Sequence, residues 1–264
     1  MRKFVILLLL LFSQMIQAQV SLQIQSNFDT KRSDAALAQV PMLVLNDSSD
    51  VSSDYIMLRE GDMLFQDLNS SSVSDAIEGV TKREGSMNFS HCGIIVKTKK
   101  GLAVIEAIGD RVQMNSVEKF LRRSEGEGIS QCIRVSKNGK IIYVPSNMRT
   151  AQIFRLKLEY RTGEFIKAIS EASKYAKSVL GVPYDDPFIL DNGKLYCSEL
   201  LYECFKEFHI FDSILKPMTF KASNSDSFLP AWVEYYEKLG LPIPEGKLGL
   251  NPVSLSRSPK LLKL

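Results

Sequence analysis

The sequence is poor in the residues on which thiol and imidazole chemistry depends. Its 264 residues include only 2 histidines and 4 cysteines. His91 and Cys92 are adjacent and have no partner pair at zinc-ligand spacing, so we expect no metal and no cofactor. An excess of one charge is also lacking, because 33 Lys and Arg balance 30 Asp and Glu to a net +3. This balance excludes the strong positive field that recruits nucleic acid.

Long apolar runs are scarce as well. A content of 45% hydrophobic and 24% charged residues is that of a globular chain. The chain opens with two cations, an apolar run at 4–12 and the small residue Ala18, which is the layout of a cleavable secretory signal. That run is too short for a membrane span, which needs about 20 apolar residues. We expect residues 1–18 to be a signal peptide and the mature protein to be secreted or periplasmic, with no membrane span.

The remainder divides into three parts. Residues 19–55 are polar and show no helical or strand period, so we expect a poorly ordered lead-in. Residues 240–264 hold 4 of the 10 prolines, which predicts a tail that runs extended over the surface. The working domain is then 56–239.

Periodicity within this domain indicates strands followed by helices. Apolar runs at 91–97 and 102–108 predict one hairpin, and those at 131–136 and 141–144 flank an Asn-Gly turn and predict a second. A helix follows from Glu164, with one apolar face formed by Phe165, Ile169, Ala172, Ala176 and Val179. After a Gly- and Pro-bearing loop, a second helix begins at Cys197 or Ser198. The order predicts an α+β fold.

Cys197 is the candidate nucleophile. A thiol in the first helical turn lies near the positive end of the helix dipole, which favours the thiolate. The alternative is that Cys197 is simply a small residue in the first turn.

A thiolate nucleophile usually has an imidazole beside it. His209 lies too far along the same helix from Cys197, which leaves His91 at the start of a strand. Glu106, inside the apolar run at 102–108, would approach His91 across the first hairpin and orient its ring. The alternatives are a structural histidine and an outward-facing glutamate.

In combination, these stretches resemble the circularly permuted papain-like family of YiiX and YaeF type, which is related to the NlpC cell-wall peptidases. The matching stretches are GDMLF at 61–65, FSHCGIIV at 89–96, VIEAIGDRVQ at 104–113, GVPYDDPF at 181–188 and LYCSELLYECF at 195–205. The resemblance implies a barrel-like antiparallel sheet packed on helices. It also implies Cys197 as nucleophile, His91 as base and then acid, Glu106 as its orienting partner, Tyr184 near the site and Ser198 as an oxyanion donor.

By compartment and resemblance, the expected activity is a thiol hydrolase, a peptidase or amidase, that cleaves an amide bond in cell-envelope peptides. Two alternatives remain: a lipid acyl hydrolase or acyltransferase with the same triad, and a binding module without turnover. The partner is accordingly a small peptide or lipid-derived substrate of the envelope.

Three smaller expectations concern other side chains. Cys92 and Cys132, both in strand-like runs, either form a disulfide or stay as buried thiols, and we favour thiols. Arg122 and Arg123 are expected to be solvated surface residues. Trp232, with Tyr235 and Tyr236, has helical spacing that favours core packing over a carbohydrate-binding face.

Overall fold

The computed structural model describes seven segments of the chain: 55–68, 72–81, 88–123, 131–146, 150–157, 163–222 and 225–264. All of them fall within one compact unit, Asp47–Leu264. The expected signal peptide and almost all of the expected lead-in lie outside the described residues, so both stay predictions. In the segments described, no helix combines the length and the apolar character of a membrane span.

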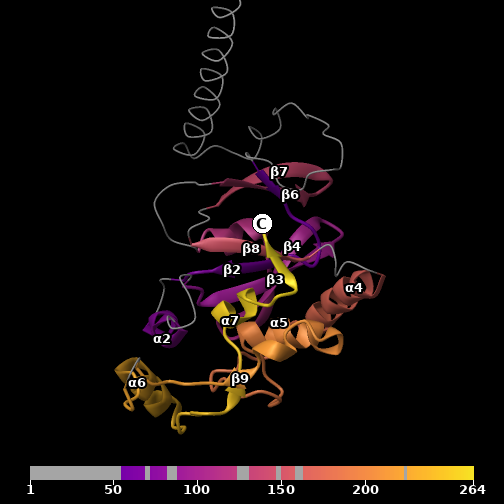
Figure 1. Cartoon of the computed structure of the whole chain (residues 1–264). Coiled ribbons are helices and arrows are strands. Elements are labelled where there is room, and N and C mark those ends of the chain that lie inside the picture. The colour runs from indigo at the N-terminus through magenta and orange to yellow at the C-terminus, as the bar shows by residue number, and fades with distance from the viewer. Residues whose placement is uncertain are drawn as a thin grey trace, which may run out of the picture. The chain divides into compact units, whose positions relative to one another are not determined.

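A curled, mostly antiparallel sheet forms the centre of the fold (Figure 1). Its strands run in the order β1-β6-β4-β3-β2-β8-β11, with β5 beside β4 and β7 beside β6. Only the short β1–β6 pairing is parallel among the pairs described. The strands are β1 Tyr55–Met57, β2 Met63–Gln66, β3 His91–Thr98, β4 Gly101–Ile108, β5 Arg111–Asn115, β6 Gln131–Lys137, β7 Lys140–Ser146, β8 Ala151–Leu156 and β11 Leu261–Lys263.

Both predicted hairpins are confirmed. Strands β3 and β4 pair with Ile94 opposite Ile105. Strands β6 and β7 are joined at Asn138 and Gly139, whose φ angles of 52° and 72° are the positive values that a tight hairpin turn requires.

Helices pack against both faces of the sheet. The α-helices described are α2 Ser72–Thr81, α3 Val117–Leu121, α4 Gly163–Ser178, α5 Cys197–Phe205, α6 Pro230–Leu239 and α7 Pro252–Ser256. Helices α4, α5 and α7 cover one face of the sheet, α3 packs on the opposite face, and α2 packs with α6. Helix α4 packs on α5, and α5 packs directly on β3 and β4 (Figure 1). The predicted apolar face of α4 is confirmed, because Ala172 and Ala176 are fully buried and its larger members pack against the same core. The α+β class is therefore confirmed.

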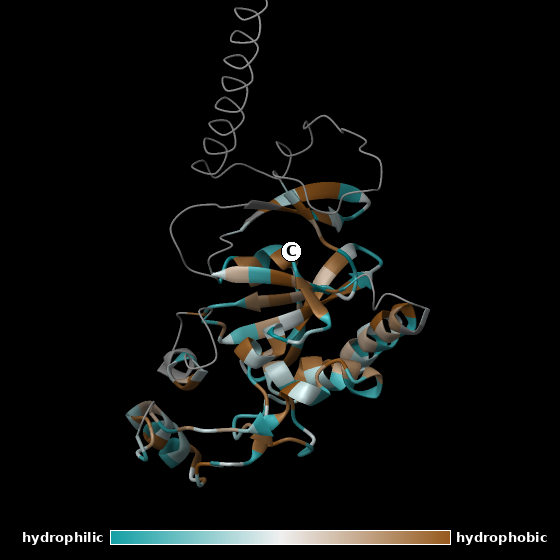
Figure 2. Cartoon of the chain, viewed as in Figure 1, coloured by the Kyte–Doolittle hydropathy of each residue, from teal (hydrophilic) through white to brown (hydrophobic). Residues whose placement is uncertain are grey.

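The central strands β2, β3 and β4 are buried on both faces of the sheet, which explains why they are the most apolar of its strands (Figure 2). One cluster fills the space between the sheet and helices α4 and α5, and includes Cys92, Ile94 and Ile105. The other lies on the opposite face and includes Ile95, Val104 and Phe120. Neighbouring residues of β3 thus point to opposite faces, so Cys92 faces α5.

The expectation for residues 240–264 is wrong. Instead of an extended surface tail, they form α7 and β11, and β11 adds an antiparallel strand beside β8. Leu250, Val253 and Leu255 enter the core between the sheet and its helices. Proline permits this because Pro252 occupies the first turn of α7, where no backbone N–H is needed, and Asn251 caps the helix.

Candidate active site

The structure brings His91 and Glu106 together at one end of the sheet. His91 is the first residue of β3, and Glu106 lies on the adjacent strand β4. His91 Nε2 lies 2.6 Å from Glu106 Oε2, and the two side chains are 4% and 0% exposed. Because this contact uses Nε2, Nδ1 is the ring nitrogen left for a second partner.

Glu106 is held by more than His91. Asn115 Nδ2 donates to Glu106 Oε1 at 2.8 Å, and the Arg123 guanidinium pairs with Oε2. Lys119 Nζ in turn donates to Asn115 Oδ1 at 2.8 Å. Both carboxylate oxygens are therefore satisfied, as a buried charge requires. Burial would raise the pKa of Glu106, but hydrogen bonds from His91 and Arg123 outweigh it and lower the pKa to about 2.

Phe120 fixes the plane of the histidine ring. The two rings stack with centroids 5.6 Å apart and an interplanar angle of 30°. The Arg123 guanidinium lies 5.2 Å from the Phe120 ring centroid and also donates a hydrogen bond to Glu106. The expectation that Arg122 and Arg123 are both solvated is thus wrong for Arg123, because the turn after α3 folds it back over Phe120; Arg122 is exposed as expected.

Cys197 lies at the first position of α5, as the sequence predicts. The N-cap residue, Tyr196, has extended backbone angles and its side chain does not cap the helix. Helix geometry leaves the N–H groups of Cys197 and Ser198 without an intrahelical acceptor, so they are free to bind an anion. The thiol is 5% exposed.

The pKa values of Cys197 and His91 are shifted in opposite directions. Hydrogen bonding from Cys92 and then from His91, against the effect of burial, lowers the pKa of the Cys197 thiol well below its ordinary value. Burial would lower the pKa of His91, but hydrogen bonds with Cys197 and Glu106 raise it to about 9. Both shifts favour an anionic sulfur beside a protonated ring, the state that favours nucleophilic attack.

Gly93 makes the approach of β4 possible. It lies two residues after His91, and a Cβ at this position would lie 2.7 Å from Val104 Cγ1 and 3.2 Å from Glu106 Cβ. Its φ is not in the left-handed region, so the requirement is for space rather than for backbone freedom. A residue with a side chain here would push Glu106 away from the sheet.

Ser198 and Tyr184 also lie at this site. Ser198 is fully buried, and its Oγ lies 3.9 Å from Cys197 Sγ. Tyr184 is half-buried in the loop before α5, where its N–H donates to the Asp110 carbonyl. Burial, and after it the negative charge of Cys197, raises the pKa of the Tyr184 phenol well above its ordinary value. The five sequence-predicted site residues therefore cluster around one thiol.

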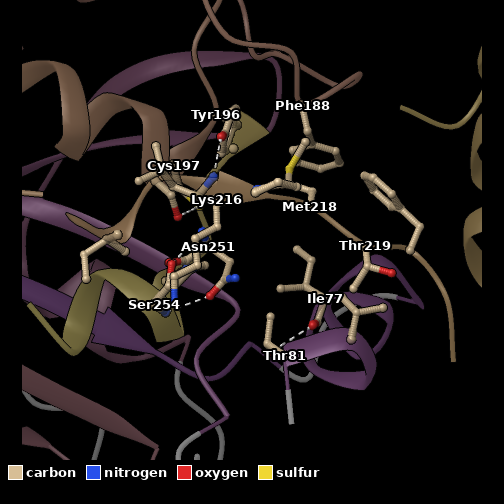
Figure 3. Close-up of a pocket in the computed structure, with 18 of the residues that line it drawn as sticks. Ile77, Thr81, Phe188, Tyr196, Cys197, Lys216, Met218, Thr219, Asn251 and Ser254 are labelled. Carbon is tan, nitrogen blue, oxygen red and sulfur yellow. Dashed lines mark hydrogen bonds between the residues drawn. The ribbon is translucent and has the colours of Figure 1, made fainter. Parts of the chain in front are cut away.

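A mostly apolar cavity of about 110 Å³ opens beside Cys197. Cys197 and Tyr196 line one wall, and Ile77 and Thr81 of α2 lie across from them (Figure 3). Further lining comes from aromatic and thioether side chains of the later part of the chain, namely Phe188, Phe220, Trp232 and Met218. Trp232 is 2% exposed and packs with Tyr236, which confirms core packing for this group of aromatic residues.

Strand–helix order and sheet topology define the class of this protein. In the order of the chain, a strand that begins with histidine precedes the helix that begins with cysteine, which is the permuted arrangement of a papain-like fold. The model of the permuted papain-like amidase enzymes of the YaeF/YiiX type, the C92 family, matches residues 57–264. The chain belongs to this family.

One solved structure similar to this chain is described as the crystal structure of metalloprotein yiiX from Escherichia coli O157:H7, DUF1105. The two are 23% identical with a TM-score of 0.56, and the match covers 78% of this chain and 96% of the other. At this identity the likeness bears on the fold alone. No curated protein sequence matches the chain.

A metal ion does not fit the donor set of this site. Within the described segments, no three side chains of His, Cys, Asp or Glu converge as metal ligands. His91 Nε2 contacts Glu106, and the Glu106 carboxylate is occupied by three donors. We therefore derive no chemical step through a metal.

Sequence reasoning did not find Asn115, Phe120, Arg123 or Gly93. Asn115 and Arg123 lie on either side of the short helix α3, and they reach Glu106 only because the β5–α3 connection folds back over β4. A local signal exists only for Gly93, where a glycine interrupts an apolar strand two residues after the histidine.

Proposed function

We propose that this protein is a secreted cysteine amidase that cleaves an amide bond in cell-envelope peptides through Cys197, His91 and Glu106. The observation that carries the proposal is the 2.6 Å contact between His91 Nε2 and Glu106 Oε2, and the opposite pKa shifts that His91 and Cys197 cause in each other support it. Membership of a family of amidases sets the reaction class. The apolar leader at 4–12 supports export, and export places the enzyme with envelope substrates.

Each group then has a defined chemical task. The Cys197 thiolate attacks the amide carbonyl, and the N–H groups of Cys197 and Ser198 stabilise the oxyanion. The His91 imidazolium protonates the leaving amine, which leaves a thioester on Cys197. The neutral ring then takes a proton from water, which hydrolyses the thioester. Glu106 holds the ring and stabilises its charge, and we assign Tyr184 to substrate contact because its pKa responds to the charge of Cys197.

A second candidate, hydrolysis or transfer of a lipid acyl group, has the cavity in its favour. The apolar lining beside Cys197 fits the acyl part of an ester or amide better than it fits a polar peptide. The same triad would serve, because the thioester chemistry is the same for both substrates. The two candidates differ only in what occupies the cavity.

Incubation with peptidoglycan fragments and, separately, with phospholipid, followed by mass spectrometry of the products, tests both candidates. We expect cleavage of an amide bond that Cys197→Ala and His91→Ala each abolish. Cys204→Ala is the matched control, because Cys204 is a buried thiol of the same helix that lies in the core. Release of fatty acid alone would favour the second candidate, and cleavage that survives in Cys197→Ala would exclude this mechanism.

A further inference from the structure

A second thiol lies against Cys197 and has no part in the proposed hydrolysis. Cys92 follows His91 on β3 and faces α5, which packs directly on this strand. Its Sγ lies 3.9 Å from Ser198 Oγ, the same distance as from Cys197 Sγ to that oxygen. Each of the two cysteines also shifts the pKa of the other, raising that of Cys92 and lowering that of Cys197. Two sulfurs from distant parts of the chain thus share one buried polar contact.

The two thiols differ in charge. Burial, and after it the hydrogen bond with Cys197, raises the pKa of Cys92 well above its ordinary value, so it stays protonated beside the Cys197 thiolate. Cys204 provides the contrast within α5: burial raises its pKa too, but neither of the other two thiols perturbs it. The pairing with Cys197 is therefore specific to Cys92 among the cysteine side chains that the structure describes.

Access to the two sulfurs is also unequal. Cys197 is among the residues that line the cavity and is 5% exposed, so it is the more accessible of the two. Cys92 is 0% exposed and can react only with a group already inside the site. A low-pKa, reachable thiol beside a protected one is the arrangement of a peroxide-reactive cysteine with its resolving partner.

We propose that Cys92 is the resolving thiol of a reversible redox switch, which forms a disulfide with Cys197 after peroxide has oxidised the nucleophile. The proposal rests on the reactive Cys197 thiolate of the proposed function. In the first step the thiolate attacks hydrogen peroxide: the O–O bond breaks, an S–O bond forms, and the hydroxide that leaves takes a proton from His91. Cys197 becomes a sulfenic acid, oxidised by two electrons, and the peroxide is reduced.

In the second step the Cys92 sulfur attacks the Cys197 sulfur. The S–S bond forms, the S–O bond breaks, and the hydroxyl leaves with the Cys92 proton as water. A dithiol reductant restores both thiols and becomes a disulfide itself. The disulfide therefore inhibits the enzyme reversibly, whereas a sulfenic acid that forms no disulfide is oxidised irreversibly to sulfinic and sulfonic acids.

The test treats the full chain with hydrogen peroxide and then with dithiothreitol, and follows it by intact mass and by iodoacetamide labelling of Cys197. In the wild type we expect a loss of two hydrogens, loss of labelling, and recovery of labelling on reduction. In Cys92→Ala we expect a gain of two or three oxygens and recovery at least about tenfold smaller. Cys204→Ala is the control and should behave like the wild type.

Peptide mapping of the oxidised wild type keeps the proposal testable if Cys92→Ala fails to fold. A cross-link between the Cys92 and Cys197 peptides supports the switch. Irreversible oxidation of Cys197 in the wild type, or a bridge from Cys197 to any other cysteine, overturns it. These readouts do not use hydrolysis, so a chain that bridges but cleaves no substrate refutes the proposed function alone, and one that cleaves but does not bridge refutes the switch alone.

Discussion

Two buried carboxylates, one on the sheet and one just before its strand β2, each accept three hydrogen bonds but have different cationic partners. Asp62, before β2, accepts from Arg155 Nε at 2.6 Å, from Arg155 Nη2 at 2.8 Å and from the Arg59 N–H at 2.7 Å. Glu106 likewise accepts three donors on its two oxygens. Each carboxylate is satisfied, so the carboxylates alone do not separate a structural pair from a reactive one.

The difference lies in the cation. Arg155 directs its guanidinium entirely to protein acceptors, with a further bond of 2.7 Å to the Met57 carbonyl, and it cannot titrate in the working range. His91 bonds Glu106 through Nε2, which leaves Nδ1 for a second partner, and Cys197 helps to raise its pKa. The first pair therefore holds strands in place, and the second holds a proton where a reaction can use it.

Replacing the carboxylate of the reactive pair should separate activity from stability most strongly. In Glu106→Gln the side-chain oxygen can still accept from Asn115, but an amide N–H₂ faces His91 and Arg123. The ring loses its acceptor and its charge stabilisation, so we expect turnover to fall on the order of 10³-fold. The pKa of His91 should fall from about 9, and alkylation of Cys197 near neutral pH should slow with it. Unchanged alkylation would show that Glu106 does not act through His91.

The structural pair should give the opposite result. Arg155→Met leaves Asp62 buried without its cation, which should lower the free energy of unfolding by about 3–5 kcal/mol in urea titrations. The double variant Asp62→Asn with Arg155→Met removes the buried charge and should recover part of that loss. In the folded fraction, Cys197 should still react with iodoacetamide at the wild-type rate. A lower rate there would mean that the two pairs are coupled.

Gly93 tests whether the reactive pair depends on the close approach of β3 and β4. In Gly93→Ala the new Cβ would lie 2.7 Å from Val104 Cγ1, so the strands must separate at the level of Glu106. We expect a loss of about 1–3 kcal/mol in unfolding free energy and a lower turnover from a displaced carboxylate. Gly163→Ala is the control, because a Cβ at Gly163 would meet no neighbouring atom within 4 Å and the change in stability should be within about 0.5 kcal/mol.

The sequence predicts those features of the two carboxylate pairs and of Cys197 that depend on residues near one another in the chain. A hairpin with alternating residues places Glu106 near His91, and helical period places Cys197 at the start of α5. The whole of the Asp62–Arg155 pair escapes such reasoning, because its partners meet only when β2 pairs with β8. The prediction of an extended tail at 240–264 is wrong for a different reason. Proline content indicates which backbone N–H groups are missing, whereas burial of this segment depends on the side chains that α7 and β11 place in the core.

Substitution of Arg123 separates its charge, which pairs with Glu106, from its packing over Phe120. We expect the smallest loss of turnover from this change. Arg123→Met keeps an apolar stem over Phe120 but removes one donor from Glu106, so we expect turnover to fall about tenfold. Arg122→Met is the matched control, because Arg122 is the exposed neighbour at the end of α3.

The pH dependence of unfolding gives the second readout of Arg123→Met. Glu106 has a pKa of about 2 in the folded protein against 4.5 ordinarily, so its stabilising contribution is present above pH 4.5 and is lost as pH falls through about 2. Without Arg123 the folded pKa moves upward and this contribution shrinks. The difference in unfolding free energy between wild type and variant should therefore be constant above pH 4.5 and disappear near pH 2. A difference that persists at that pH would come from lost packing over Phe120 rather than from lost charge.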